Sequence, residues 1–261
     1  MDRIERLLAA LMLSGFAGTT AAGQSAADSG SQRVALLELY TSEGCDSCPP
    51  ADQWLTESPR RGYHRQRVVA LAFHVDYWNS LRWIDPFSKP QYSERQKTAS
   101  LRGRARGVYT PQFLLNGRAY RRPTLRDDFG VRLDTLNREA AGTWIRVQLV
   151  TEESSRVQVT GTAKVSGAAD RNAARAWMAL YENNLSNQIM RGENRGRRLR
   201  HDFVVRHLAG PFPVDARGEA TWERHFDLNP AWKTGDLYVA AFVQSERSGD
   251  FLQALAMPYC R

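Results

Sequence analysis

Cysteine is scarce in this sequence, which contains only Cys45, Cys48 and Cys260 in 261 residues. A small domain held together by a disulfide network would contain many more. A structural zinc site would normally need two further cysteine or histidine ligands at short spacing. The cysteine content therefore leaves one closely spaced pair and one single residue. We interpret Cys260 as a free thiol, with an intermolecular link or exchange with the pair as the alternatives.

Long apolar runs are also absent beyond the first residues of the chain, so we expect no integral membrane span in the mature protein. Residues 1–23 contain the apolar stretch Leu7 to Ala17 followed by small residues, the pattern of a signal peptide cleaved near Gly23. This predicts a soluble protein that is periplasmic or secreted by a bacterium. Residues 24–32 are small and polar, and we expect them to form a disordered leader.

Negative charge is in deficit, because the net charge is +8. A basic surface can contact acidic partners, although it more often serves only as a solvated face. The 42% hydrophobic content is enough for a full core. The length and a change of pattern near Gly142 favour two domains, at residues 33–141 and 142–261.

The most informative stretch is Val34 to Leu55, where an apolar run ends in Gly44, the CxxC motif Cys45 to Cys48, and two prolines. The pattern predicts a strand that passes into a helix at the two thiols. The N-terminus of a helix stabilises a thiolate, and the two-residue gap allows a disulfide that can open and close by exchange. We therefore favour a redox pair whose sulfurs a partner can reach. A metal site and a structural or vestigial disulfide remain open.

The rest of the first domain alternates between predicted strands and helices. A second apolar strand covers residues 67–76, after a helix over 49–58. Further helices are expected over 88–101 and 124–141. Between them, Asn116-Gly117 predicts a hairpin that begins at Pro111. The strand-helix-strand unit predicts a parallel sheet whose carboxyl ends gather ligands, near the cysteines.

Three polar side chains of these strands are candidates for supporting roles. Glu38 interrupts a buried strand, so it could have a raised pKa and accept the proton of Cys48, or it could face outward at the strand end. His74 and Asp76 fall near the same sheet edge as the cysteines. They could tune the thiols or bind a metal, or simply hydrogen-bond loop backbone.

The order β-CxxC-α-β-α-β-β-α resembles the thioredoxin fold. That resemblance implies an α/β thioredoxin-like domain in which Cys45 is the attacking thiol and Cys48 the resolving thiol. It also implies a cis peptide bond between Thr110 and Pro111, whose backbone would hold a substrate chain. Four segments, ELYTSEGCDSCPPAD, AFHVDYWN, YTPQFLLNG and MRGENRGR, are similar to the family of secreted bacterial proteins called domain of unknown function 1223. This similarity extends over nearly the whole mature chain.

Negative charge lies close to the two thiols. Asp46 stands between them and Glu43 lies just upstream. Nearby carboxylates raise a thiol pKa and oppose the effect of the helix terminus. We therefore predict a pair that is less oxidising than dedicated periplasmic oxidants.

The second domain is predicted to be an all-β sandwich. Alternating runs at residues 143–150, 156–165, 174–183, 203–208, 220–228 and 237–245 are separated by Gly, Asn and Pro turns. Residues 183–201 read as a loop that carries five clustered arginines, Arg191, Arg195, Arg197, Arg198 and Arg200. Such a loop can bind carboxylate or phosphate, or it can be solvated or packed on the first domain. No aromatic residue alternates with these arginines, which argues against nucleic-acid binding.

Taken together, these patterns predict exported thiol-disulfide exchange with a protein or small-thiol partner, through Cys45 and Cys48 and without a cofactor. One alternative is a non-catalytic binding module that uses the thioredoxin scaffold and the arginine loop. The other is copper or zinc handling by Cys45, Cys48 and His74.

Overall fold

The computed structural model describes residues 24–79, 83–103, 107–121, 128–153 and 155–259. The predicted signal peptide and Cys260 lie outside them. The strands are β1 (Gln24–Asp28), β2 (Ala35–Thr41), β3 (Val68–His74), β4 (Gln112–Leu115), β5 (Arg118–Ala119), β6 (Thr143–Glu153), β7 (Arg156–Val165), β8 (Ala174–Glu182), β9 (Leu185–Gln188), β10 (Arg198–His201), β11 (Val204–Pro213), β12 (Glu219–Asp227), β13 (Leu237–Ser245) and β14 (Phe251–Pro258). The α-helices are α1 (Pro49–Glu57), α2 (Pro90–Arg102), α3 (Phe129–Asn137) and α4 (Ala168–Arg171).

Strand β2 lies at the centre of the part of the fold that carries the CxxC motif. It pairs with β3 in parallel and with β4 in antiparallel orientation, and β4 continues into β5. The predicted Asn116-Gly117 hairpin is confirmed, because both residues adopt positive φ angles, 50° and 81°. The strands and helices predicted between Val34 and Ala141 are present, with α3 shorter than expected.

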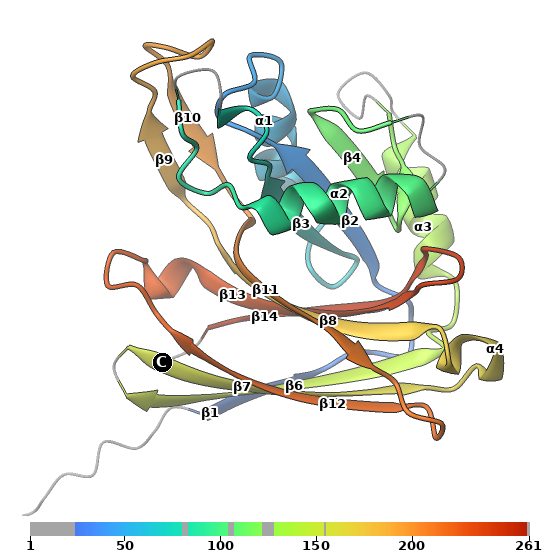
Figure 1. The fold of residues 1–261 in the computed structure, drawn as a ribbon. Helices are drawn as coiled ribbons and strands as arrows, with labels where there is room; N and C mark the ends of the chain where they lie inside the picture. Colours follow the sequence, from blue (N-terminus) through green and yellow to red (C-terminus); the bar gives the residue numbers. More distant parts are fainter. Residues whose placement is uncertain (1–23, 80–82, 104–106, 122–127, 154, 260–261) are drawn as a thin grey trace, which may run out of the picture.

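The two faces of β2 are covered by different helices (Figure 1). Leu36 and Tyr40 face one side, where they join a cluster with Tyr92 of α2. Leu37 and Leu39 face the other side, where they pack with Trp54 of α1 and residues of α3. This alternation follows from the two-residue period of a strand, and it decides which polar residues of β2 can reach the cysteines.

The prediction of two separate domains divided at residue 142 is wrong, because one sheet runs through both halves of the chain. Its strand order is β14-β13-β8-β11-β3-β2-β4-β5. The junction lies between β3 and β11, where Val204 is the register partner of Ala72 and Ala72 N donates to Phe203 O at 2.8 Å. Strand β3 is buried along its whole length, so an unpaired outer edge would leave its backbone groups without partners.

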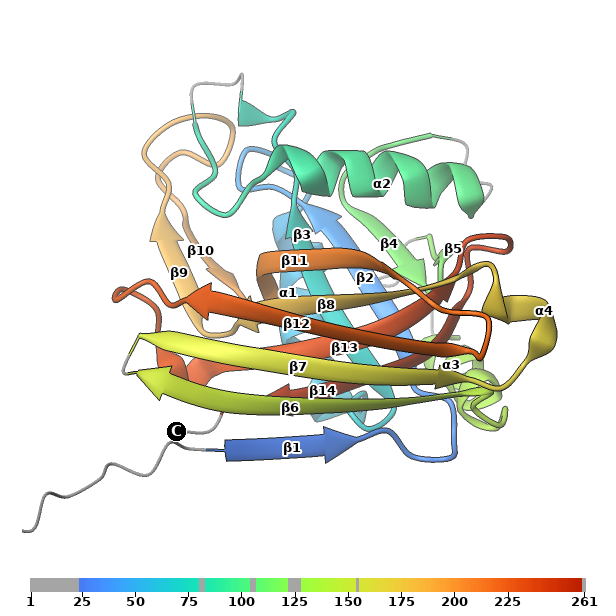
Figure 2. The ribbon, with the colours of Figure 1, turned by 60° about the horizontal axis from the view of Figure 1, so that its bottom comes forward.

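A β-sandwich is present in the C-terminal half, but it shares this long sheet. The sheet β1-β6-β7-β12 packs against the β14-β13-β8 end of the long one, and Figure 2 shows it in front. Ile145, Trp222 and Val239 belong to the apolar cluster between the two layers. The six predicted strands of this half are confirmed, and β9, β10 and β14 add three that the sequence pattern did not predict.

The disordered leader predicted for residues 24–32 is also wrong. Residues 24–28 form β1, which pairs antiparallel with β6 over Gln24–Asp28. The Asp28 carboxylate accepts from Arg146 at 2.9 Å. Backbone pairing with the edge of β6 supplies order that the small side chains do not provide. Within the described residues, no helix has both the length and the apolar character needed to cross a membrane.

Candidate functional site

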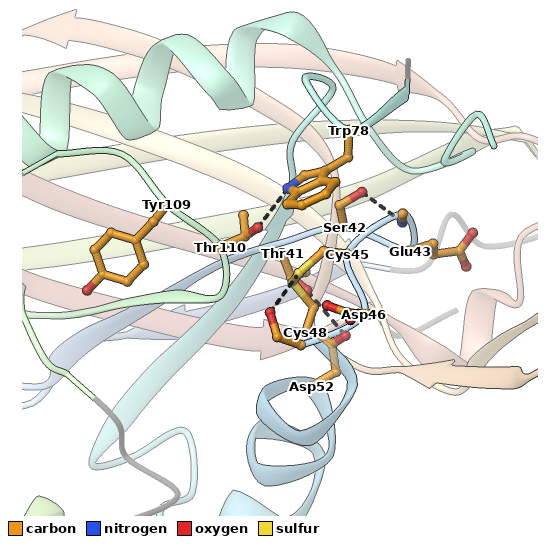
Figure 3. Close-up of a disulfide and its surroundings, with 12 residues drawn as sticks. Thr41, Ser42, Glu43, Cys45, Asp46, Cys48, Asp52, Trp78, Tyr109 and Thr110 are labelled. Carbon is orange, nitrogen blue, oxygen red and sulfur yellow. Dashed lines mark hydrogen bonds between the residues drawn. A yellow bond between two sulfur atoms is a disulfide. The ribbon is translucent and has the colours of Figure 1, made fainter. Parts of the chain in front are cut away.

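Cys45 and Cys48 form a disulfide at the N-terminus of α1 (Figure 3). Cys48 is the N-cap residue, and Pro49 and Pro50 occupy the first turn, where a missing N–H is not needed for helix hydrogen bonds. The Cα atoms of the two cysteines lie 5.4 Å apart. The strand-to-helix junction predicted from the sequence therefore brings the two sulfurs together.

The expectation that a partner can reach these sulfurs is wrong for this conformation. Both cysteines are completely buried, with exposed fractions of 0%. Asp46 and Ser47 between them are exposed, so the motif reaches the surface only through its middle residues. Exchange chemistry at this site therefore requires a movement that uncovers the disulfide.

Trp78 covers the site on one side. Its Cβ and carbonyl group lie so close to Gly44 that a Cβ atom at that position would approach them to 3.1 and 3.3 Å. Its indole Nε1 donates to Thr110 Oγ1 at 2.7 Å. Trp78 thus bridges the segment before Cys45 and the loop before Pro111, and Figure 3 shows the hydrogen bond of its indole to Thr110. The Thr110–Pro111 peptide bond is cis.

The β9–β10 hairpin, residues 185–201, covers the site on another side. Asn194 at its tip is fully buried, and its Nδ2 donates to the carbonyl oxygens of Glu43 and Cys45, at 2.9 Å each. The adjacent Glu193 accepts from Asp46 N at 3.2 Å. The loop predicted for residues 183–201 is therefore a structured hairpin that closes over the CxxC segment.

Glu43 binds both strands of this hairpin through its carboxylate. Its buried carboxylate accepts from Asn187 Nδ2 at 2.8 Å and from Trp83 Nε1 at 2.8 Å, and it lies 3.2 Å from His201 Nε2. One carboxylate therefore connects β9, β10 and the segment after β3. Such a fully partnered buried charge favours one arrangement of these segments.

The role predicted for Glu38 is wrong. Its carboxylate is buried and accepts from Arg95 Nε at 2.8 Å and from the Tyr40 hydroxyl at 3.1 Å. Arg95 belongs to α2, which lies on the face of β2 opposite α1. Because Glu38 alternates with Leu37 and Leu39, its side chain points away from Cys48.

A different carboxyl group lies on the cysteine side of the sheet. Asp52 follows Cys48 by one helical turn, and its N–H donates to Cys48 O at 3.1 Å. Thr41 Oγ1 donates to the Asp52 carboxylate at 3.2 Å, and His201 Nδ1 lies 3.6 Å away. Burial raises the pKa of Asp52, and the nearby His201 and His74 only partly oppose that effect.

His74 and Asp85 form a second buried pair beside this group. His74 Nδ1 lies 2.7 Å from Asp85 Oδ2, and the ring packs edge-on against His201 with centroids 4.9 Å apart. Burial disfavours the charged form of His74, but Asp85, with smaller contributions from Asp52 and Glu43, raises its pKa overall. Burial likewise acts to raise the pKa of Asp85, and His74 with two backbone N–H donors lowers it overall.

The arrangement does not assemble Cys45, Cys48 and His74 into a metal site. The two sulfurs are bonded to each other, and His74 Nδ1 faces Asp85. Across the described part of the chain, no group of three or more His, Cys, Asp or Glu side chains is placed to hold a metal ion. Asp76, at the same sheet edge, accepts from Ser93 Oγ.

The five predicted anion-binding arginines, Arg191, Arg195, Arg197, Arg198 and Arg200, are all exposed on the β9–β10 hairpin. Arg197 donates to Asn194 Oδ1 at 2.8 Å, which orients the buried amide. The arginines therefore surround the cover of the disulfide.

The site contains residues that the sequence patterns did not reveal. Asp52, His201, Trp78 and Asn194 come from a helix, a hairpin strand, a loop and a hairpin tip that are far apart in the chain. Asp52 offered one signal, because it is an acid next to the inward-facing Trp54 in a short helix.

A family model described as "Protein of unknown function (DUF1223)" matches residues 36–244. The chain belongs to this family. A crystal structure of a protein from Agrobacterium tumefaciens superposes with a TM-score of 0.61 at 25% identity, covering 89% of this chain and 97% of that chain. HBP35 of Porphyromonas gingivalis superposes with a TM-score of 0.63 at 16% identity, covering 88% and 76% of the two chains, which shows similarity of fold alone. No curated protein matches the sequence at a significant level.

Proposed function

We propose that this DUF1223 protein is an exported thiol-disulfide exchange protein that reacts through Cys45 and Cys48. The observation that carries the proposal is the disulfide between these neighbours at the N-terminus of α1. The arrangement of β2, α1, β3, α2, β4, β5 and α3 further supports a thioredoxin-like unit. An oxidising compartment such as the periplasm would maintain the disulfide.

In the proposed reaction, the reduced Cys45 thiolate attacks a partner disulfide and forms a mixed disulfide. Cys48 then loses its proton and attacks Cys45 Sγ, which releases the partner as a thiolate and closes the Cys45–Cys48 bond. The partner gains two electrons and the cysteine pair loses them. The reverse sequence oxidises a dithiol, and the measured reduction potential decides which direction operates.

Because Cys45 and Cys48 are buried, the proposed function requires the residues that cover them to move. A partner sulfur can approach only after the β9–β10 hairpin, Trp78 or both have moved, because Asn194 and Trp78 bind the segments on either side of the disulfide. A disulfide that is held under hydrogen-bonded segments is also what a purely structural role would require. However, a bridge that closes so short a loop removes little chain entropy, which favours a chemical role.

The experiment is to trap the intermediate. The Cys48→Ser variant should retain a mixed disulfide with a partner protein or a small thiol, whereas Cys45→Ser should trap none. Mass spectrometry under non-reducing conditions detects the adduct. The absence of any adduct on Cys48→Ser, together with no disulfide reduction by the wild type, would sink the proposal.

A second candidate is a binding module whose arginine-bearing hairpin holds an anionic partner. The exposure of all five arginines favours it. The Cys45→Ser variant separates the two functions, because anion binding on the hairpin would survive the loss of the thiol. Salt sensitivity of that binding would identify the arginines as the contact.

A further inference from the structure

Asp52 is a buried acid with no fixed cationic partner in hydrogen-bonding contact. Only 5% of its surface is exposed, and the nearest imidazole nitrogen, His201 Nδ1, lies beyond hydrogen-bonding distance at 3.6 Å. That nitrogen has no hydrogen-bond partner of its own. A buried carboxyl group whose only hydrogen-bond donor is a hydroxyl and whose nearest imidazole is this distant costs stability, so a role other than folding would explain its presence.

The helix places this acid one turn after the resolving cysteine. Asp52 lies four residues after Cys48, the N-cap of α1, and side chains at that spacing lie on one helix face with Cβ atoms about 5–6 Å apart. Both residues are buried, and in Figure 3 the Asp52 carboxylate lies on the side of Cys48.

The resolving step of the proposed reaction needs a base at this position. The buried Cys48 thiol must lose a proton before its sulfur can attack Cys45, and Glu38 is on the other face of the sheet. We propose, resting on the thiol-disulfide exchange proposed above, that Asp52 accepts the proton of Cys48 and that His201 is the positioning residue that sets its basicity. When the reaction runs in reverse, Asp52 returns the proton to Cys48.

The protons and electrons balance in both steps. Cys45 thiolate breaks the partner's S–S bond and forms a new one, and one partner thiolate leaves. The Cys48 proton passes to Asp52, the Cys48 thiolate displaces the second partner thiolate from Cys45, and the proton then leaves Asp52 for solvent. Asp52 is suited to this role because burial raises its pKa towards that of a thiol.

Several neighbouring groups influence the pKa of Asp52. The groups that face it are Thr41 of β2, His201 of β10, His74 of β3 and Asp85 of the following segment, and Cys48 lies one turn away at the N-cap of α1. The two histidines lower the pKa of Asp52 and Asp85 raises it. His201 also lies on β10 of the hairpin that covers the disulfide, so the residue that positions the base belongs to the cover.

The test follows the reduced full-length protein as it reacts with an aromatic disulfide that releases a coloured thiol. The wild type should release one thiol when the reagent reacts with Cys45 and a second when Cys48 closes the ring. In Asp52→Asn the first phase should be unchanged, and the second should slow by about 100-fold near neutral pH. The control is Glu57→Gln, which neutralises a partly exposed acid near the far end of the same helix and should leave both phases as in the wild type.

The outcomes separate this inference from the function on which it rests. If the wild type releases no second thiol, thiol-disulfide exchange itself fails. If the wild type releases both but Asp52→Asn closes the ring at the wild-type rate, the assignment of Asp52 is overturned.

A second variant addresses the case in which Asp52→Asn does not fold. His201→Gln removes a group that lowers the pKa of Asp52, so the pH midpoint of the second phase should move upward. A midpoint that stays at the wild-type value would overturn the assignment, because a purely structural histidine would not shift it.

Discussion

The titration of three buried residues, His74, Asp85 and Asp52, changes the stability of the fold in opposite directions as pH rises. His74 has a raised pKa, so its pairing with Asp85 stabilises the fold fully below the ordinary histidine pKa of about 6.5 and is lost as pH rises through the folded value. The pKa of Asp85 is lowered in the folded protein, so its ionised form stabilises the fold above the ordinary aspartate pKa of about 3.9. This stabilisation is lost as pH falls through the folded pKa of Asp85. Asp52, with its raised pKa, weakens the fold as pH rises through its folded value. These signs place maximum stability in mildly acidic solution.

The His74→Gln variant tests this arrangement. It leaves the buried Asp85 carboxylate without its cationic partner, so we expect a loss of about 3 kcal/mol in the free energy of unfolding at mildly acidic pH. The loss should shrink as pH rises above the folded pKa of His74. Urea denaturation at several pH values measures both effects. His64→Gln, at an exposed histidine, is the control, and a pH-independent loss would contradict the pairing.

The sequence indicated some of these residues and concealed others. Cys45 and Cys48 were found because spacing along one helix start determines whether two sulfurs meet. Glu38 was misjudged because a one-residue alternation in β2 decides which face it occupies. His201 reaches Glu43 across 158 positions of sequence, and no local pattern encodes that contact.

At the scale of elements, the β9–β10 hairpin covers the CxxC segment through Asn194. We expect Asn194→Ala to speed reduction of the disulfide by a small thiol about tenfold or more, because it removes two hydrogen bonds of about 1 kcal/mol each that hold the cover closed. Thiol quantification against time after adding the reductant measures the rate. The control is Arg198→Ala on the exposed face of the same hairpin.

An unchanged reduction rate in Asn194→Ala would show that the hairpin is not the barrier and would direct attention to Trp78. The global free energy of unfolding must be measured in parallel, since faster reduction through general destabilisation would not identify a local cover. The sequence predicted this element only as a flexible basic loop, because its arginines and glycines dominate the pattern. Its short strands and the buried Asn194 depend on contacts with a distant segment.

For the whole molecule, the continuous sheet predicts one cooperative unit. A fragment of residues 33–141, the domain expected from the sequence, would expose the outer edge of β3 and the apolar side chains that pack against Tyr181 and Phe242. We therefore expect the fragment to lack a cooperative thermal transition, whereas the full chain unfolds in a single one. Circular dichroism in the far and near ultraviolet measures both, and a sharp transition in the fragment would refute the prediction.

The sequence predicted most strands of both halves, but it did not predict that they form one continuous sheet. Apolar periodicity reports that a strand is buried without reporting which neighbour covers its edge. The pairing of β3 with β11 involves strands separated by over half the chain, and only Val204 and Phe203 mark the join.

The order of these parts along the chain also matters for biosynthesis. Cys45 and Cys48 leave the ribosome, or any export channel, well before residues 187–201 that enclose them. A nascent chain therefore presents both thiols openly to cellular oxidants, and the finished protein hides them. We therefore expect the disulfide to form more readily during maturation than after residues 185–201 have folded over it.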